Sequence, residues 1–215
     1  MTYLQLINAV LRRLREEQVT TVDESDYSRL IGDYVNDAKR QVEDSWDWSA
    51  LRTDFTVNTV AGTSTYTLTG SGNRTEILEV FNETDNTVVN KASLSDINRY
   101  KLATDDDNGD IIGYSVSRVD SNGDMVIKLH ATPDAVKTLT FKTVKRPSDL
   151  EVDSDSLLVP SAPVVQYAYS FALRERGETG GQTASEQAAF AKQDLNNAIA
   201  LDAAMRPEET IWITV

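Results

Sequence analysis

The side chains with the most obvious chemical potential are a single histidine and many carboxylates. His130 is the only histidine in 215 residues and cysteine is absent, so the chain lacks the donors of a His- or Cys-based zinc site. His130 stands in an alternating run, IKLHATP, which favours an ordinary strand residue over a catalytic one. No G-x-S-x-G, P-loop or H-E-x-x-H motif occurs. We therefore expect no catalytic residue, no cofactor and no metal ligand, and predict that the protein is not an enzyme.

An acidic run, TDDDNGD at 104–110, is the best candidate for a cation site. With Gly109 at the sixth position of a calcium loop, Thr104 occupies the first and Ser115 the twelfth, where a bidentate Glu is required. The match fails at both ends, which favours a solvated acidic loop. The chain has 34 Asp and Glu residues, but their spacing identifies no acid pair of the glycosidase type.

Helical periodicity defines the elements before residue 50. Residues 2–17 read as a helix that Thr2 caps, and a second helix begins at Ser25 and carries an apolar stripe as far as Trp46. Because Trp46 ends that stripe, we interpret it as a plug in the core. Trp48 follows where alternation begins, so both tryptophans are predicted to pack at the junction between helix and β structure.

The pattern changes to alternation over about 51–150 and then returns to helical spacing. The alternating part predicts about six strands with little helix, including a hairpin that turns at Asn122-Gly123. A further helix is predicted from Ser161 to Gly177, and an alanine-rich helix follows to about Met205.

This order of elements predicts an α+β fold. The N- and C-terminal helix pairs would form a four-helix bundle, a mostly antiparallel β domain would be inserted between them, and an extended arm would end the chain. The expected boundaries are 1–50 and 157–206 for the helical bundle domain, 51–156 for the inserted β domain and 207–215 for the arm.

Charge and hydropathy limit the possible partners. The net charge is −13 and the pI about 4.5, so the chain repels nucleic acid on average, although acidity also simply favours solubility. No apolar run approaches the ~20 residues that cross a bilayer, so no membrane partner is expected. The N-terminal residues lack the order of a signal peptide, and the absence of cysteine fits folding in a reducing cytoplasm.

Three stretches, taken in order, carry a resemblance to a known family. They are the opening helix pair running into WDWSALRTDFTVNTVAGTSTYTL, the proline-led helix in LLVPSAPVVQYAYSFALRERGETGGQ, and the alanine-rich last helix with its free tail. Their order, over most of the chain, resembles the head-to-tail adaptor (connector) proteins of short-tailed bacteriophages, the tail tubular protein A-like group.

The resemblance implies a structural role in the virion neck after assembly in the host cytoplasm. It implies a ring of about twelve copies that docks under the portal protein, extends the DNA channel without specific DNA binding and receives the tail nozzle protein. The helices would form the ring body and the β domain would face neighbours or the nozzle. The C-terminal arm would contact the portal or a neighbouring subunit through its apolar residues, Ile211, Trp212, Ile213 and Val215.

Two other classes of function stay open at this point. One is a wall-degrading hydrolase that uses paired carboxylates brought together by the fold. The other is a β-sandwich binding module with helical flanks. The module would require exposed aromatic side chains on one β face, for which the available residues are Tyr66, Phe81, Tyr114 and Phe141.

Overall fold

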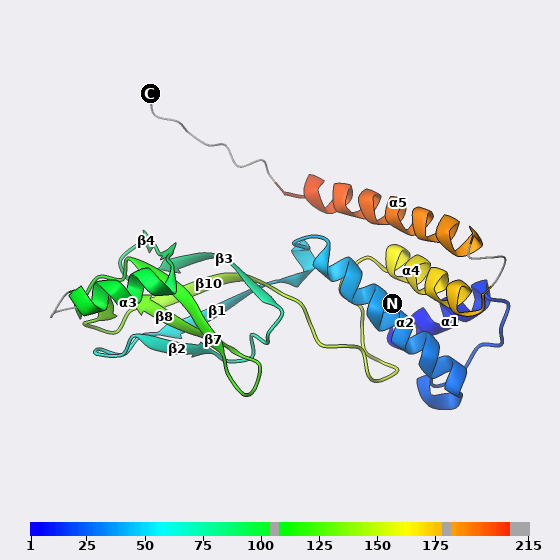
Figure 1. Ribbon diagram of the computed structural model, residues 1–215, viewed down its shortest axis with the longest axis horizontal. Coiled ribbons are helices and arrows are strands. Elements are labelled where there is room, and N and C mark those ends of the chain that lie inside the picture. The colour runs from blue at the N-terminus through cyan, green and yellow to red at the C-terminus, as the bar shows by residue number, and fades with distance from the viewer. Residues whose placement is uncertain (104–107, 178–181, 207–215) are drawn as a thin grey trace, which may run out of the picture. The chain divides into compact units, whose positions relative to one another are not determined.

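A computed structural model describes residues 1–103, 108–177 and 182–206. Its contacts divide the chain into two compact units, Met1–Leu51 with Ser148–Val215 and Arg52–Pro147. We call them the helical unit and the β unit and describe each by itself. The fold is mixed α+β, as the sequence predicts, with five α-helices and two larger sheets in the described parts (Figure 1).

The helical unit contains α1 (Tyr3–Arg13), α2 (Asp26–Asp44), α4 (Ser161–Glu175) and α5 (Gln182–Ala204). Short 3-10 turns precede α2 (η1, Val22–Glu24) and follow it (η2, Ser49–Leu51). Thr2 and Gln5 form the capping box of α1, which confirms the predicted start. The predicted end at residue 17 is wrong: α1 ends at Arg13, and Arg15 takes a positive φ of 60°, which a helix does not allow.

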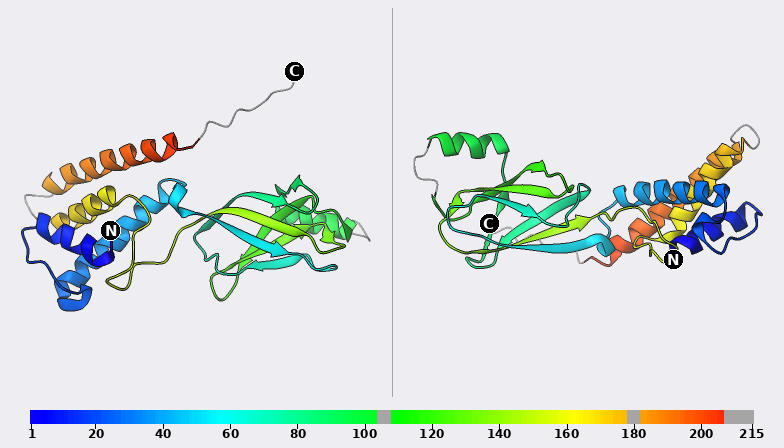
Figure 2. Two further views of the ribbon diagram at one scale, coloured as in Figure 1. Left: turned by 180° about the vertical axis from the view of Figure 1, so that it is seen from behind. Right: turned by 90° about the horizontal axis from the view of Figure 1, so that it is seen from below.

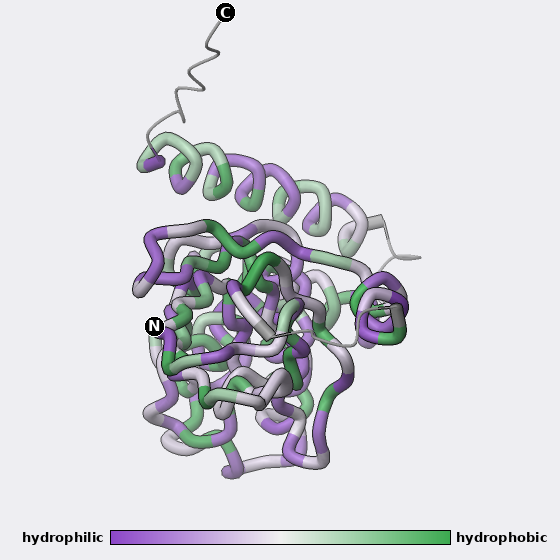
Figure 3. Tube along the Cα trace, turned by 90° about the vertical axis from the view of Figure 1, so that its left-hand side faces the viewer, coloured by the Kyte–Doolittle hydropathy of each residue, from purple (hydrophilic) through white to green (hydrophobic). Residues whose placement is uncertain are grey.

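Helix α4 lies between α5 on one side and α1 and α2 on the other (Figures 1 and 2). Most of the buried side chains of α4 are small or branched, and Tyr167 is the one buried aromatic side chain of this helix. Helix α5 packs mainly on α4, and apolar and polar residues alternate along it (Figure 3). Fully buried apolar residues of the core come from all four helices: Leu6, Ile7, Val10, Ile31, Val35, Ala38, Val42, Val164, Ala168, Ala172 and Ala191.

A return segment, residues 148–159, binds the N-terminus of the chain. The Tyr3 N–H donates to the Asp155 carbonyl at 2.8 Å, and the Leu157 N–H donates to the Met1 carbonyl at 3.0 Å. The buried Asn36 amide bonds both the N–H and the C=O of Leu150. Residues 148–156 therefore belong with the helices by contact, whereas the pattern of the sequence placed them with the β domain.

The β unit is built on two sheets of four strands. One has the order β1-β10-β3-β4 and the other β2-β8-β7-β5, where only the β5–β7 pair is parallel. The strands are β1 (Arg52–Asn58), β2 (Thr65–Leu68), β3 (Thr75–Asn82), β4 (Thr87–Val88), β5 (Asn90–Lys91), β7 (Gly113–Val119), β8 (Met125–His130) and β10 (Thr138–Lys145).

Short elements complete the β unit. Strands β6 (Asn108–Gly109) and β9 (Thr132–Pro133) form a parallel pair, and α3 (Leu94–Ala103) packs on β7 and β8. The described part of the chain thus has ten strands rather than about six, because two-residue strands leave no alternating pattern. The predicted hairpin is confirmed: β7 and β8 flank Asn122-Gly123, and Gly123 has a φ of 86°.

The core of the β unit combines inward residues of both sheets. Leu68, Ile127 and Leu129 come from one sheet, and Val80 and Leu139 come from the other. The buried rings of Tyr114 and Phe141 meet edge to face at 6.0 Å, which joins the two sheets at the centre.

Candidate interaction surfaces

Side chains that could bind a metal ion are the first candidates for a functional site in the described residues. Within these ranges, no group of three or more His, Cys, Asp or Glu could hold a metal ion. His130 ends strand β8, as predicted for a strand residue, and its ring meets Tyr100 edge to face at 4.5 Å. Residues 104–107 of the acidic run lie outside the described ranges. None of the helices that the structure describes is long and apolar enough to cross a membrane.

The two junction tryptophans occupy different environments within the helical unit. Trp48, only 1% exposed, donates its indole N–H to the Val42 carbonyl at 2.8 Å and so folds back over the end of α2. Trp46 is half-buried, and its indole N–H donates to Asp202 at 2.9 Å. The interpretation of Trp46 as the core plug is therefore wrong. Because α2 ends at Asp44, the chain turns and Trp48 enters the core instead.

Asp202 links the end of α5 to the residues that follow α2. Its carboxylate accepts hydrogen bonds from Trp46, from the Ser49 N–H and from Arg206. Burial opposes ionisation, but the hydrogen bonds of Arg206, Trp46 and Ser49 outweigh it and hold the pKa of Asp202 below its usual value. Arg206 also lies 5.0 Å from the centre of the Trp46 ring. The chain is thus anchored beside Trp46 just before residue 207.

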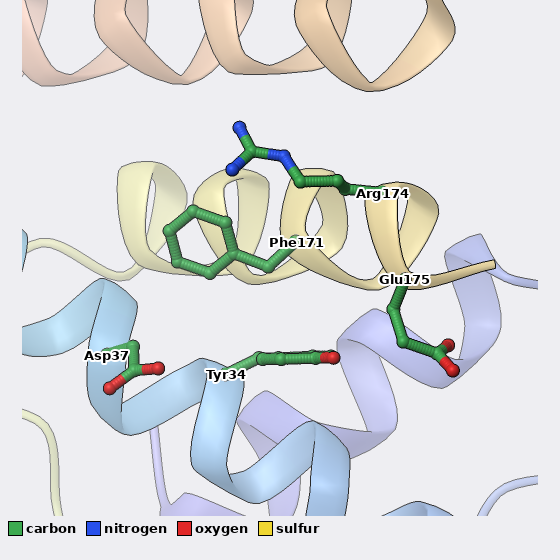
Figure 4. Close-up of a pocket in the computed structure, with 5 residues that line it drawn as sticks. All are labelled: Tyr34, Asp37, Phe171, Arg174 and Glu175. Atoms are coloured by element: carbon green, nitrogen blue, oxygen red, sulfur yellow. The ribbon is translucent and has the colours of Figure 1, made fainter. Parts of the chain in front are cut away.

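A groove runs between α2 and α4. Tyr34 and Phe171 meet edge to face at 6.2 Å, and Asp37, Arg174 and Glu175 surround these two rings (Figure 4). Its volume is about 380 Å³, within the range of roughly 300–1,000 Å³ that binding pockets occupy. The two rings could pack against one large apolar side chain of a bound segment, and the charged residues around them could contact a neighbouring polar group of that segment.

Helix α5 leaves large apolar residues in solvent. Phe190, Leu201 and Met205 are 54%, 68% and 77% exposed. Phe190 and Leu201 are eleven residues apart, about three turns, which places them on one face of α5, and Met205 follows the last residue of the helix, Ala204. Beyond this helix, the predicted contact residues of the arm lie outside the described residues: Ile211, Trp212, Ile213 and Val215.

Negative charge is concentrated in the helical unit. This unit holds 21 Asp and Glu against 10 Lys and Arg, whereas the β unit holds 13 against 11. Net charges of −11 and −2 follow, so the β unit is nearly neutral. Composition alone showed the acidity of the chain, but the division of charge emerges only from the two units.

The aromatic residues of the β unit do not form an exposed face. Tyr114 and Phe141 are buried, and the Tyr66 hydroxyl bonds the backbone of Val60 and Thr63. Phe81 is half-buried and lies beside the exposed Val88 in an open hollow of about 580 Å³ at the β3–β4 edge. This edge is one apolar surface of the β unit, and Tyr100 and Leu102 on α3 are also exposed.

Comparison with known proteins identifies one family. The model of the family described as SU10 adaptor protein matches residues 1–210. A search of curated proteins finds no match. The family match covers both units and nearly the full length of the sequence.

Proposed function

The chain belongs to the SU10 adaptor protein family, and from this we propose that it joins the portal of a phage head to the tail nozzle. Members of this family are phage structural adaptors, so the protein is a structural component of the virion. The observation that carries the proposal is the family match over residues 1–210, which includes both units. The role depends on binding other head and tail proteins, and no catalytic step is needed.

The proposed assembly is a closed ring of about twelve copies with head-to-tail contacts, since only heterologous contacts that close enclose a channel. In this proposal the four helices form one bundle domain together with the return segment and serve as the ring body. The β unit, Arg52–Pro147, faces neighbouring subunits or the nozzle. The exposed apolar edge at Val88 supports a contact role for it.

The proposed ring lets DNA pass without gripping it. The helical unit carries a net charge of −11, and duplex DNA is bound mainly through cations that neutralise its phosphates. We therefore place the acidic helical unit along the channel. A channel wall of like charge keeps DNA mobile during ejection.

The proposed portal contact is the arm, residues 207–215. Pro207 cannot donate a helical hydrogen bond, and four apolar side chains follow within five residues: Ile211, Trp212, Ile213 and Val215. A segment of this kind adds to a partner through its backbone, while its side chains supply specificity. Trp212 is the proposed anchor, because buried aromatic residues dominate the energies of interfaces.

Electron microscopy of the protein mixed with its portal tests the adaptor role. We expect a ring with a central hole on the portal, and no attachment when residues 207–215 are removed. A Phe190→Ser variant is the matched control, because it changes an exposed apolar residue outside the arm. A stable two-fold dimer that ignores the portal would contradict the proposal, and so would nanomolar binding of duplex DNA at physiological salt.

A further inference from the structure

We propose that the groove between α2 and α4 binds the C-terminal segment of the same chain in the free subunit, with Trp212 seated against Tyr34 and Phe171. The groove is the described surface that combines two accessible aromatic rings with a free cation. Its occupant is residues 207–215, the last nine residues of the sequence. The binding itself does not depend on the adaptor role, although its release toward a portal rests on the proposed function.

The reach of the segment fits this groove. Arg206 is held beside Trp46 by Asp202, and Asp37 and Tyr34 lie nine and twelve residues before Trp46. At 1.5 Å per residue along α2, Asp37 and Tyr34 lie about 10 Å and 15 Å from the last residue of that helix, Asp44. Trp212 lies six positions after Arg206, and an extended chain of six residues spans about 20 Å. The chain between Arg206 and Trp212 is therefore long enough to reach the groove.

The chemistry of the groove fits the end of the chain. Its aromatic floor matches an indole ring, which packs edge to face or offset on other rings. Arg174 has no ion-pair partner among the described residues, so it is available to a carboxylate of the segment such as Glu209, three residues before Trp212. Figure 4 places the Arg174 guanidinium on the Phe171 side of the groove, away from the Glu175 carboxylate. The opposing Asp37 faces Arg40 at 3.4 Å, which reduces its repulsion of a carboxylate.

Because the segment is tethered to the groove by its own chain, binding within one subunit is favoured over binding to another subunit. A short tether gives an effective concentration in the millimolar range, far above that of a dilute subunit. Covering the apolar segment also protects it from pairing with other chains, a hazard of exposed β-prone ends.

The test is ¹⁹F NMR of the full chain labelled with 5-fluorotryptophan. The three tryptophans give three signals, and a Trp212→Phe variant assigns the third. We expect the Trp212 signal to differ from that of the free peptide PEETIWITV, to stay unchanged on dilution and to be shielded from a soluble quencher. In a Phe171→Ser variant the signal should move to the position of the free peptide. Unchanged Trp46 and Trp48 signals would show that the helical unit stays folded.

A Phe190→Ser variant is the control, since Phe190 is exposed on α5 outside the groove. Its Trp212 signal should match that of the unaltered chain. A Trp212 signal identical to the free peptide in the unaltered chain would overturn the proposal. A shielded signal that disappears on dilution would overturn it as well, because it would indicate binding between copies. These outcomes concern the free subunit alone, so they are separate from the fate of the portal experiment.

Discussion

Lys39 and Glu43 form an ion pair in the interior of the helical unit, with 2.9 Å between the ammonium and the carboxylate. The two side chains are 1% and 0% exposed, and Lys39 also donates to the Ser148 carbonyl at 2.9 Å. The pair thus ties α2 to the point where the return segment begins. A buried ion pair stabilises a fold little more than apolar side chains of the same size would. A single buried charge without its partner, however, strongly destabilises the fold.

Replacing one member of this pair should destabilise the helical unit strongly. For Lys39→Met we expect a loss of roughly 3–5 kcal/mol in the free energy of unfolding, because the Glu43 carboxylate would stay buried without its cation. Guanidinium unfolding followed by circular dichroism measures it. Adding Glu43→Leu should recover most of the loss. Arg40→Ala is the control: its pair with Asp149 is exposed, so the loss should stay below about 1 kcal/mol. Equal losses for Lys39 and Arg40 would contradict this account.

Local periodicity predicted the helices well but not the contacts between distant segments. The stripes of α1 and α2 follow from a 3.6-residue period, and the turn at Asn122-Gly123 follows from local turn chemistry. The return segment has no period, and its bonds to Met1 and Tyr3 join residues about 150 positions apart. Tyr34 and Phe171 likewise meet only through the packing of α2 on α4. No pattern within one element can reveal such a groove.

The two junction tryptophans should differ in their effects on stability. Trp48→Ala should cost roughly 3–5 kcal/mol, since it empties a buried site in a packed core. Trp46→Phe keeps an aromatic ring and loses one hydrogen bond to Asp202, so a cost of about 1 kcal/mol is expected. Chemical unfolding of both variants measures the difference. A larger loss for Trp46→Phe would restore the interpretation of Trp46 as the core plug.

Gly32 permits the close approach of α1 and α2. A Cβ atom at this position would lie 2.4 Å from the Tyr3 hydroxyl, closer than real Cβ contacts allow. Gly32→Ala should therefore destabilise the helical unit by roughly 1–3 kcal/mol, although alanine is the better helix former. The double variant with Tyr3→Phe removes the clashing oxygen and should lose less than the sum of the two single changes. Strict additivity in thermal or chemical unfolding would exclude the clash.

Ionisation of Tyr3 should make the helical unit sensitive to base. Burial, with a smaller contribution from Asp33, raises the pKa of Tyr3 to about 12. Because the folded pKa lies above the usual value near 10, the stabilisation is complete below pH 10 and is lost as pH rises through 12. Tyr3→Phe cannot ionise, so its melting temperature should fall less between pH 9 and pH 12. A parallel fall in both proteins would contradict this assignment.

Asp124 should make the β unit sensitive to acid. Its carboxylate accepts the N–H groups of Gly72 and Gly70, both at 2.9 Å, and these bonds hold the pKa of Asp124 below its usual value. Because the folded pKa lies below the unfolded one, the stabilisation is present above the unfolded pKa and is lost as pH falls through the folded pKa.

The Asp124→Asn variant isolates this contribution. An amide presents one acceptor oxygen in place of two, so the variant should be less stable at pH 7, and its stability should fall less between pH 7 and pH 3. Amide hydrogen exchange of β2 and β8 follows the β unit separately from the helices. Asp134→Asn, at an exposed position, is the control and should keep the slope of the unaltered chain. Equal slopes for all three proteins would show that the two glycine N–H groups do not set the acid stability of this unit.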